Sequence, residues 1–194
     1  MFGNRSSVFV KERVGFLKLT DVYDLLDAES QAPLGEARDE PSALGKWARL
    51  LVKKALLPTT VNVYEGGNPA PILSIHKRPT FFRGRLEIRD LNGQPLAFMT
   101  SKFFSLGGAF ALSDAQGQPL AEVKGDWKGW NFTATFADGR AMGVITKKWA
   151  GLAKELLTNA DQYLVAADPG AGHQVLPVLL GAALAIDLTF KEQQ

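Results

Sequence analysis

Residues 173–190, HQVLPVLLGAALAIDLTF, contain one charged residue after the opening histidine, Asp187. The apolar residues fall on every face of a helix, which is typical of a membrane span or of a helix enclosed by protein. A span needs roughly 20 predominantly apolar residues. This run is shorter, contains a carboxylate and lacks aromatic belts, so a buried helix is the preferred interpretation.

The small residues of this helix lie in one part of it, where we expect a neighbouring backbone to approach closely. Pro177 fits a first helical turn, where a missing N–H costs nothing. Fourteen residues of helix make a rod about 21 Å long, and such a rod needs a closed wall around it. The small residues are Gly181, Ala182, Ala183 and Ala185.

The remainder of the sequence is predicted to form the wall around this helix. Five segments share a pattern of strand, acidic residue, polar or glycine turn and returning strand, and three of the turns lead into a single proline. Asp, Asn and Gly supply the local hydrogen bonds and positive φ that tight reversals require, and proline suits the start of a returning strand. Repeated hairpins predict an antiparallel meander closed into a barrel around the helix. The segments are residues 16–34, 61–72, 86–96, 110–120 and 132–140.

Length and composition indicate one globular domain spanning residues 1–194. The chain has no cysteine, which excludes disulfides, thiolate nucleophiles and thiolate metal sites. Its first 16 residues show no long apolar core, so no secretory signal is expected and a cytoplasmic location is predicted.

Charge is unevenly distributed along the chain. Residues 41–160 hold 16 basic and 8 acidic side chains, whereas both flanking regions are mildly acidic. A basic middle indicates an anionic partner, and an ordinary solvated surface is the alternative.

Two segments depart from the strand pattern. Residues 42–57, SALGKWARLLVKKALL, are amphipathic at helical spacing. They predict either a crossover docked on the barrel or a helix lying on a membrane surface with Trp47 as its anchor. Residues 149–158 predict a short helix.

Motifs for enzymatic chemistry are absent. Gly170-Ala-Gly172 lacks the third glycine and the second parallel strand of a dinucleotide site. No P-loop or G-x-S-x-G elbow occurs. His76 and His173 lack paired ligand spacing. The sequence therefore predicts a protein that is not an enzyme.

One segment is a candidate for a hard cation such as calcium, although no cofactor is expected. Asn159, Asp161 and Asp168 could supply oxygen ligands, but the glycine and glutamate of an EF-hand are missing. A turn with a capping aspartate is the alternative interpretation.

The C-terminal residues resemble the phospholipid scramblase family. Residues 145–163, ITKKWAGLAKELLTNADQY, look like its basic-x-Trp-x-Gly, Glu and Thr-x-Ala-Asp-x-aromatic signature. The terminal helix and residues 73–79, LSIHKRP, are also similar. The resemblance implies the fold shared with plant LURP-one-related proteins and the Tubby C-terminal domain, a mainly β, closed antiparallel barrel of about twelve strands around a hydrophobic C-terminal helix. The family's cysteine-rich palmitoylation run is missing, and Asn159 replaces the first Asp of its calcium segment.

These observations predict a barrel that binds anionic phospholipid head groups at a membrane surface and assists phospholipid movement between leaflets. The expected location is peripheral, on the inner face of the plasma membrane. The oligomeric state is left open. The predicted phosphate-facing residues are Lys46, Arg49, Lys53, Lys54, Lys77, Arg78, Arg83 and Arg85.

Two alternatives stay open. One is a soluble domain that binds a ligand or a protein partner. The other is a nucleic-acid binder in which Trp127, Trp130 and Phe132 are interleaved with Lys124 and Lys128, because aromatic rings beside cations suit single strands.

Overall fold

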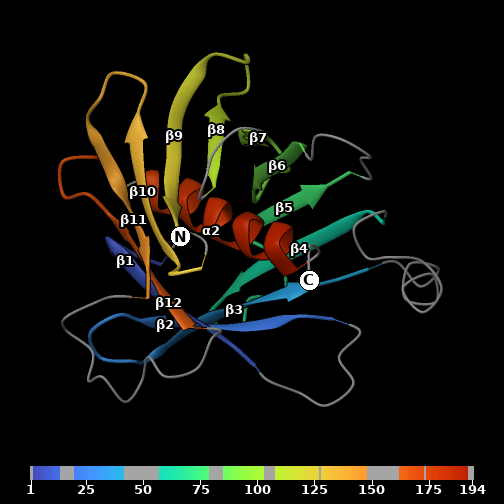
Figure 1. Cartoon of the computed structure of the whole chain (residues 1–194). Coiled ribbons are helices and arrows are strands. Elements are labelled where there is room, and N and C mark those ends of the chain that lie inside the picture. The colour runs from blue at the N-terminus through green and yellow to red at the C-terminus, as the bar shows by residue number, and fades with distance from the viewer. Residues whose placement is uncertain are drawn as a thin grey trace.

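The protein is a closed antiparallel barrel in the computed structural model, which describes residues 2–13, 20–41, 57–78, 85–102, 108–126, 128–147, 162–172 and 174–191. Each strand pairs with its neighbours in sequence, and β1 pairs with β12 to close the ring (Figure 1). The predicted fold class is confirmed. The strands are β1 (Ser7–Glu12), β2 (Val22–Asp27), β3 (Pro33–Asp39), β4 (Thr59–Glu65), β5 (Leu73–Lys77), β6 (Arg85–Asp90), β7 (Pro95–Ser101), β8 (Ala109–Ser113), β9 (Pro119–Asp126), β10 (Asn131–Phe136), β11 (Ala141–Thr146) and β12 (Gln162–Ala167).

The five predicted hairpins are all present, and aspartate side chains hold four of their turns. Oδ1 of Asp90 accepts the backbone N–H groups of Asn92 and Gln94 at 2.9 and 2.8 Å. Asp114 does the same for the backbone of residues 116 and 118. Asp27 and Asp138 cap their turns similarly. These side-chain bonds replace the strand ladder where the chain reverses.

The core of the barrel is α2 (Val175–Lys191), which runs through the ring of strands (Figure 1). It packs against β5, β6, β7, β11 and β12. Strand side chains alternate between the two faces of the wall, so Leu86 and Ile88 of β6 are buried inside with Leu180 of the helix. The predicted buried helix is confirmed.

Gly181 of α2 makes room for a side chain of the barrel wall rather than for a backbone. A Cβ atom added at Gly181 would lie 2.7 Å from Cγ2 of Ile88. On β11, by contrast, a Cβ atom added at Gly143 would first meet the backbone oxygen of Ala166 at 2.3 Å and then Cδ2 of Leu179 at 2.6 Å. The expectation of close backbone approach is therefore wrong at Gly181, because the branched Ile88 fills the gap that the missing side chain leaves.

A cluster of polar side chains, the helix-end cluster, fixes the C-terminal turn of α2 inside the barrel. It comprises Glu12, Tyr23, Asp187 and Lys191. The Tyr23 hydroxyl donates to Oδ2 of Asp187. Lys191 Nζ lies 3.0 Å from the same oxygen and 2.6 Å from Oε2 of Glu12. These partners compensate for the burial of Asp187, which is 6% exposed.

Electrostatics within this cluster favour the protonated forms of its tyrosine and lysine. Burial raises the pKa of Tyr23 well above its ordinary value, and the nearby Asp187 raises it further. Burial alone would lower the pKa of Lys191, but the charge of Asp187 and the hydrogen bond to Glu12 outweigh it and raise that pKa.

The two ends of the barrel differ in their connections. The five hairpins turn at the end where α2 begins. The helix-end cluster lies at the other end. The strands on either side of each longer gap between the described ranges have their gap-facing ends there too. The predicted segments 42–57 and 149–158 fall in two of these gaps, and only Leu57 of them is described.

Candidate functional site: an arginine pocket on the outer face

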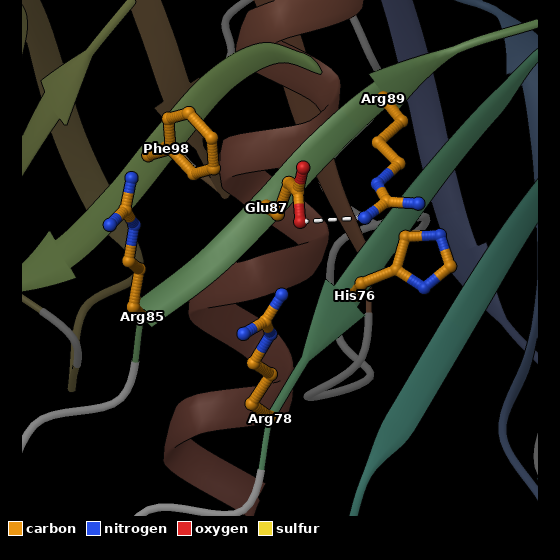
Figure 2. Close-up of a pocket in the computed structure, with 6 residues that line it drawn as sticks. All are labelled: His76, Arg78, Arg85, Glu87, Arg89 and Phe98. Carbon is orange, nitrogen blue, oxygen red and sulfur yellow. Dashed lines mark hydrogen bonds and ion pairs between the residues drawn. The ribbon is translucent and has the colours of Figure 1, made fainter. Parts of the chain in front are cut away.

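A pocket on the outer face of the barrel is lined by side chains from three neighbouring strands, and most of these side chains are basic (Figure 2). It has a volume of about 290 Å³. We call it the arginine pocket. Its lining residues are His76, Arg78, Arg85, Glu87, Arg89 and Phe98.

Strand alternation and register explain why these residues meet. Leu86 and Ile88 point inward, so Arg85, Glu87 and Arg89 of β6 point outward. Ladder pairing sets His76 of β5 opposite Glu87, and Phe98 of β7 opposite Glu87 on the other side. The pocket is thus a product of two strand registers centred on Glu87.

The three arginines have different surroundings. Arg89 donates to Oε2 of Glu87 at 2.9 Å, and this bond, with the nearby arginine charges, lowers the pKa of Glu87. The guanidinium carbon of Arg85 lies 3.9 Å from the centre of the Phe98 ring, a cation–π contact that orients it. Arg78 and Arg85 are exposed, and neither forms an ion pair with a described residue.

His76 completes the pocket on the β5 side. Its Nδ1 lies 3.2 Å from Oγ1 of Thr60 and its Nε2 lies 3.0 Å from Oγ of Ser74. Burial, and secondarily the charge of Arg89, lowers the pKa of this imidazole, while Glu87 opposes them. His76 is therefore mainly neutral at pH 7.

Three arginines and one glutamate give the pocket a positive balance at neutral pH. Guanidinium groups present several N–H donors in a planar fork that matches phosphate or carboxylate oxygens. Because Glu87 already pairs with Arg89, Arg78 and Arg85 are the groups available to an incoming anion. The arrangement is suited to binding an anion.

The predicted phosphate-facing residues are divided between the pocket, the core and the part of the chain outside the described ranges. Arg78 and Arg85 line the pocket. Lys77 is 7% exposed and shares the inner face of β5 with Leu73 and Ile75, so it does not line the pocket. The others, with the predicted anchor Trp47, lie outside the described residues: Lys46, Arg49, Lys53, Lys54 and Arg83.

Sequence reasoning missed four lining residues, His76, Glu87, Arg89 and Phe98. The period-two spacing of Arg85, Glu87 and Arg89 was a readable sign that they share one strand face. No comparable signal joins His76 and Phe98 to them, because that depends on strand register.

The predicted cation ligands are only partly described. Asn159 and Asp161 lie outside the described residues. Oδ1 of Asp168 accepts the backbone N–H of Gly170 at 2.9 Å, so it caps the turn after β12. Within the described ranges, no group of three or more His, Cys, Asp or Glu residues could hold a metal ion.

The aromatic residues of the nucleic-acid alternative are used in packing. Phe132 is fully buried. The Trp130 ring stacks on Tyr163 with centroids 4.8 Å apart, and Lys147 Nζ lies 5.2 Å from it. Trp127 lies outside the described residues. Neither of the two described rings is an open platform for a base.

A second, larger cavity of about 740 Å³ lies on β2, β3 and β4. Its basic residues already have carboxylate partners. Arg13 lies 2.5 Å from Asp24 and 3.1 Å from Glu36, and Arg38 also pairs with Glu36. An anion there would have to displace these carboxylates, so the arginine pocket is the stronger anion site.

No described helix combines the length and the hydropathy needed to cross a bilayer.

Comparison with known proteins agrees with the barrel architecture. No solved structure matches the chain. The model of the Scramblase family matches residues 80–193, which is more than half of the chain and includes β6 to β12 and α2. Because this match covers more than half of the chain, the chain belongs to the Scramblase family.

Proposed function

We propose that the barrel binds anionic phospholipid head groups at a membrane surface and that the arginine pocket holds the phosphate. The observation that carries this proposal is the pair of exposed arginines, Arg78 and Arg85, which face one pocket without a carboxylate partner among the described residues. The family supports a role with phospholipids.

Charge and position favour a membrane surface over a small soluble anion. Each basic residue near an anionic leaflet contributes about 1 kcal/mol of binding free energy. Arg78 directly follows β5 and Arg85 begins β6, so both stand at one end of the barrel. Strand β3 ends at the same end of the barrel, and the predicted basic run at residues 46–54 follows it in the sequence. Those basic residues stay a prediction as additional lipid contacts.

The proposed activity is binding, and it includes no chemical step. Assisted movement of phospholipids between leaflets would be a consequence of this binding. The Scramblase family is not a family of conventional enzymes. We therefore propose a peripheral protein on the inner face of the plasma membrane that requires no cofactor.

Vesicle sedimentation tests the proposal. The wild type should sediment with phosphatidylglycerol-containing vesicles and remain in the supernatant with phosphatidylcholine vesicles. Binding should weaken with salt, because charges farther apart than about 8–10 Å are screened near physiological ionic strength. Arg78→Glu/Arg85→Glu should reduce binding at least about tenfold, from the loss of two favourable charges of about 1 kcal/mol each and their reversal.

Arg140→Glu is the matched control for the single variant Arg85→Glu, because both change the net charge by the same amount. Arg140 is an exposed arginine in the hairpin between β10 and β11, at the other end of the barrel. Its reversal should leave vesicle binding within about twofold of wild type, an effect well below that of one leaflet-facing charge. Equal loss of binding in both variants would indicate an effect of net charge alone and would contradict the pocket assignment.

A further inference from the structure

We propose that His76 is a proton-dependent binding residue of the arginine pocket, whose protonation adds a third unpaired positive charge beside Arg78 and Arg85 (Figure 2). Anion binding should then strengthen as the pH falls. The inference rests on the proposed function, since it requires an anion to occupy the pocket.

The position of His76 gives its charge access to a bound anion. The residue lies on the outer face of β5, partly buried, and its ring is among the groups that line the pocket. Figure 2 shows it on the same side of the sheet as Arg78 and Arg89. A positive charge on this ring would attract an anion held at Arg78 in the same pocket. The surrounding protein reduces the screening of this attraction by salt.

The hydrogen bonds of His76 accommodate both protonation states without movement of the strands. Both partners, Thr60 and Ser74, are hydroxyls, and a hydroxyl can donate or accept. When the ring is neutral, one hydroxyl donates to the unprotonated nitrogen. When the ring is protonated, both hydroxyls accept. The charged form therefore needs a hydroxyl rotation and no movement of the strand.

The charges that face the ring decide when it protonates. Strand β6 contributes Arg85, Glu87 and Arg89, and Arg78 follows β5. On the β4 side the described hydrogen-bonding partner is the uncharged hydroxyl of Thr60. Glu87 is engaged by Arg89, so the arginines prevail and, with burial, keep the pKa of His76 below its ordinary value in the empty pocket.

A bound anion changes this balance, and the coupling is reciprocal. The anion offsets the repulsion from the arginines and raises the pKa of His76. By thermodynamic linkage, protonation of His76 must raise the affinity for the anion by the same factor. A coupling of one pKa unit corresponds to about a tenfold change in affinity.

Sulfate is a suitable probe because its charge does not change across this pH range. Titration of the wild type by calorimetry should give an affinity about three- to tenfold higher near pH 5.5 than near pH 8, as expected for a coupling of up to one pKa unit. His76→Gln keeps hydrogen-bonding capacity towards both hydroxyls but cannot take a charge. Whatever its absolute affinity, the variant should bind sulfate equally well near pH 5.5 and near pH 8, because the increase at low pH requires the imidazole charge.

The chain provides its own control, because His173 is the only other histidine. His173→Gln should keep the full pH effect. With two imidazole signals in the spectrum, NMR should show that sulfate raises the pKa of His76 in the wild type. A wild-type affinity that is equal at both pH values, or an increase that persists in His76→Gln, would overturn the inference.

The two proposals fail in different ways. If the wild type binds sulfate equally well at both pH values, and binds anionic vesicles through Arg78 and Arg85, the pocket function stands and the role of His76 is wrong. If it binds neither sulfate nor anionic vesicles at either pH, the pocket function itself is wrong and the inference falls with it.

Discussion

The helix-end cluster and the arginine pocket lie on opposite faces of the same wall and use charge in opposite ways. Inside, Asp187 is 6% exposed and engages both Tyr23 and Lys191. Outside, Arg78 and Arg85 are exposed and form no ion pair with a described residue. Charge that is buried and fully paired holds the last helical turn in place, whereas charge that is exposed and unpaired is available to a ligand.

The energetics of the two regions should differ accordingly. Removing one member of a buried pair leaves an uncompensated charge and costs about 3–5 kcal/mol. Exposed charges contribute about 0–1 kcal/mol to stability. Mutations in the helix-end cluster should therefore affect folding, and mutations in the pocket should affect binding. The predictions that follow test this division.

The largest loss of stability is expected when a charged residue is placed in the apolar core, on which both regions depend. Leu180 is fully buried in the lumen, and Leu180→Asp would place an unpaired carboxylate there, which should prevent soluble folding. Circular dichroism and thermal melts measure this. Val144→Asp is the control, because Val144 is 37% exposed on the outer face of β11 and should tolerate the change within about 1 kcal/mol. A cooperative melt of Leu180→Asp would contradict the enclosed helix.

Asp187→Ala should lower the free energy of unfolding by up to about 3–5 kcal/mol, because it removes one of the two carboxylates beside Lys191 and the acceptor of the Tyr23 hydroxyl. Urea denaturation measures the loss. Arg140→Ala removes the exposed ion pair with Asp138, so its cost should stay below about 1 kcal/mol. Similar losses in the two variants would remove the distinction between buried and exposed charge.

Alkaline pH should weaken the helix-end cluster. The folded-state pKa values of Tyr23 and Lys191 are both raised, so the folded protein holds these protons more tightly than the unfolded chain. Their stabilisation is complete below the unfolded pKa values of about 10 and is lost as the pH rises through the folded values. Urea denaturation from about pH 8 upward should show the decline beginning near pH 10. Tyr23→Phe should have a shallower decline, and an unchanged slope would exclude Tyr23 as a source.

The smallest effect is expected at Phe98, which orients Arg85 in the pocket. Phe98→Leu removes the cation–π contact, worth about 0.5–1 kcal/mol at an exposed site, and should weaken binding to anionic vesicles by about two- to fivefold. The melting temperature should change little. Phe136→Leu is the matched variant, since Phe136 makes a similar contact with Arg140 away from the pocket. If both variants bind vesicles equally, Phe98 does not position Arg85 for the ligand.

Much of the fold was readable in the sequence because its signals are local. The helix was predicted over residues 173–190 and is found at Val175–Lys191, since apolar residues on all faces indicate enclosure. The turns were predicted from aspartates such as Asp90 and Asp114, whose side chains do bind the turn backbone. The number of strands came from the family resemblance, because turn signals mark only five of the connections.

The pocket was only partly readable because it depends on register. Arg78 and Arg85 were predicted from charge alone. His76 and Phe98 join them across strand pairs whose register no local pattern specifies. Lys77 was predicted to face phosphate because a charged residue is usually exposed. Its spacing from Leu73 and Ile75 instead places it on the inner face of β5.

The position of α2 in the chain also imposes an order on biosynthesis. The ribosome completes all twelve strands before it makes the helix that fills their lumen. Strand β1 cannot pair with β12, the strand that closes the barrel, until β12 has been made. The apolar inner faces of the strands lack α2, their central packing element, for longer still. Pairings of such long sequence separation form slowly, and exposed strand edges and apolar surface promote aggregation in the meantime. The barrel should therefore reach its packed form only after α2 has been made, which places the last step of folding late in the order of synthesis.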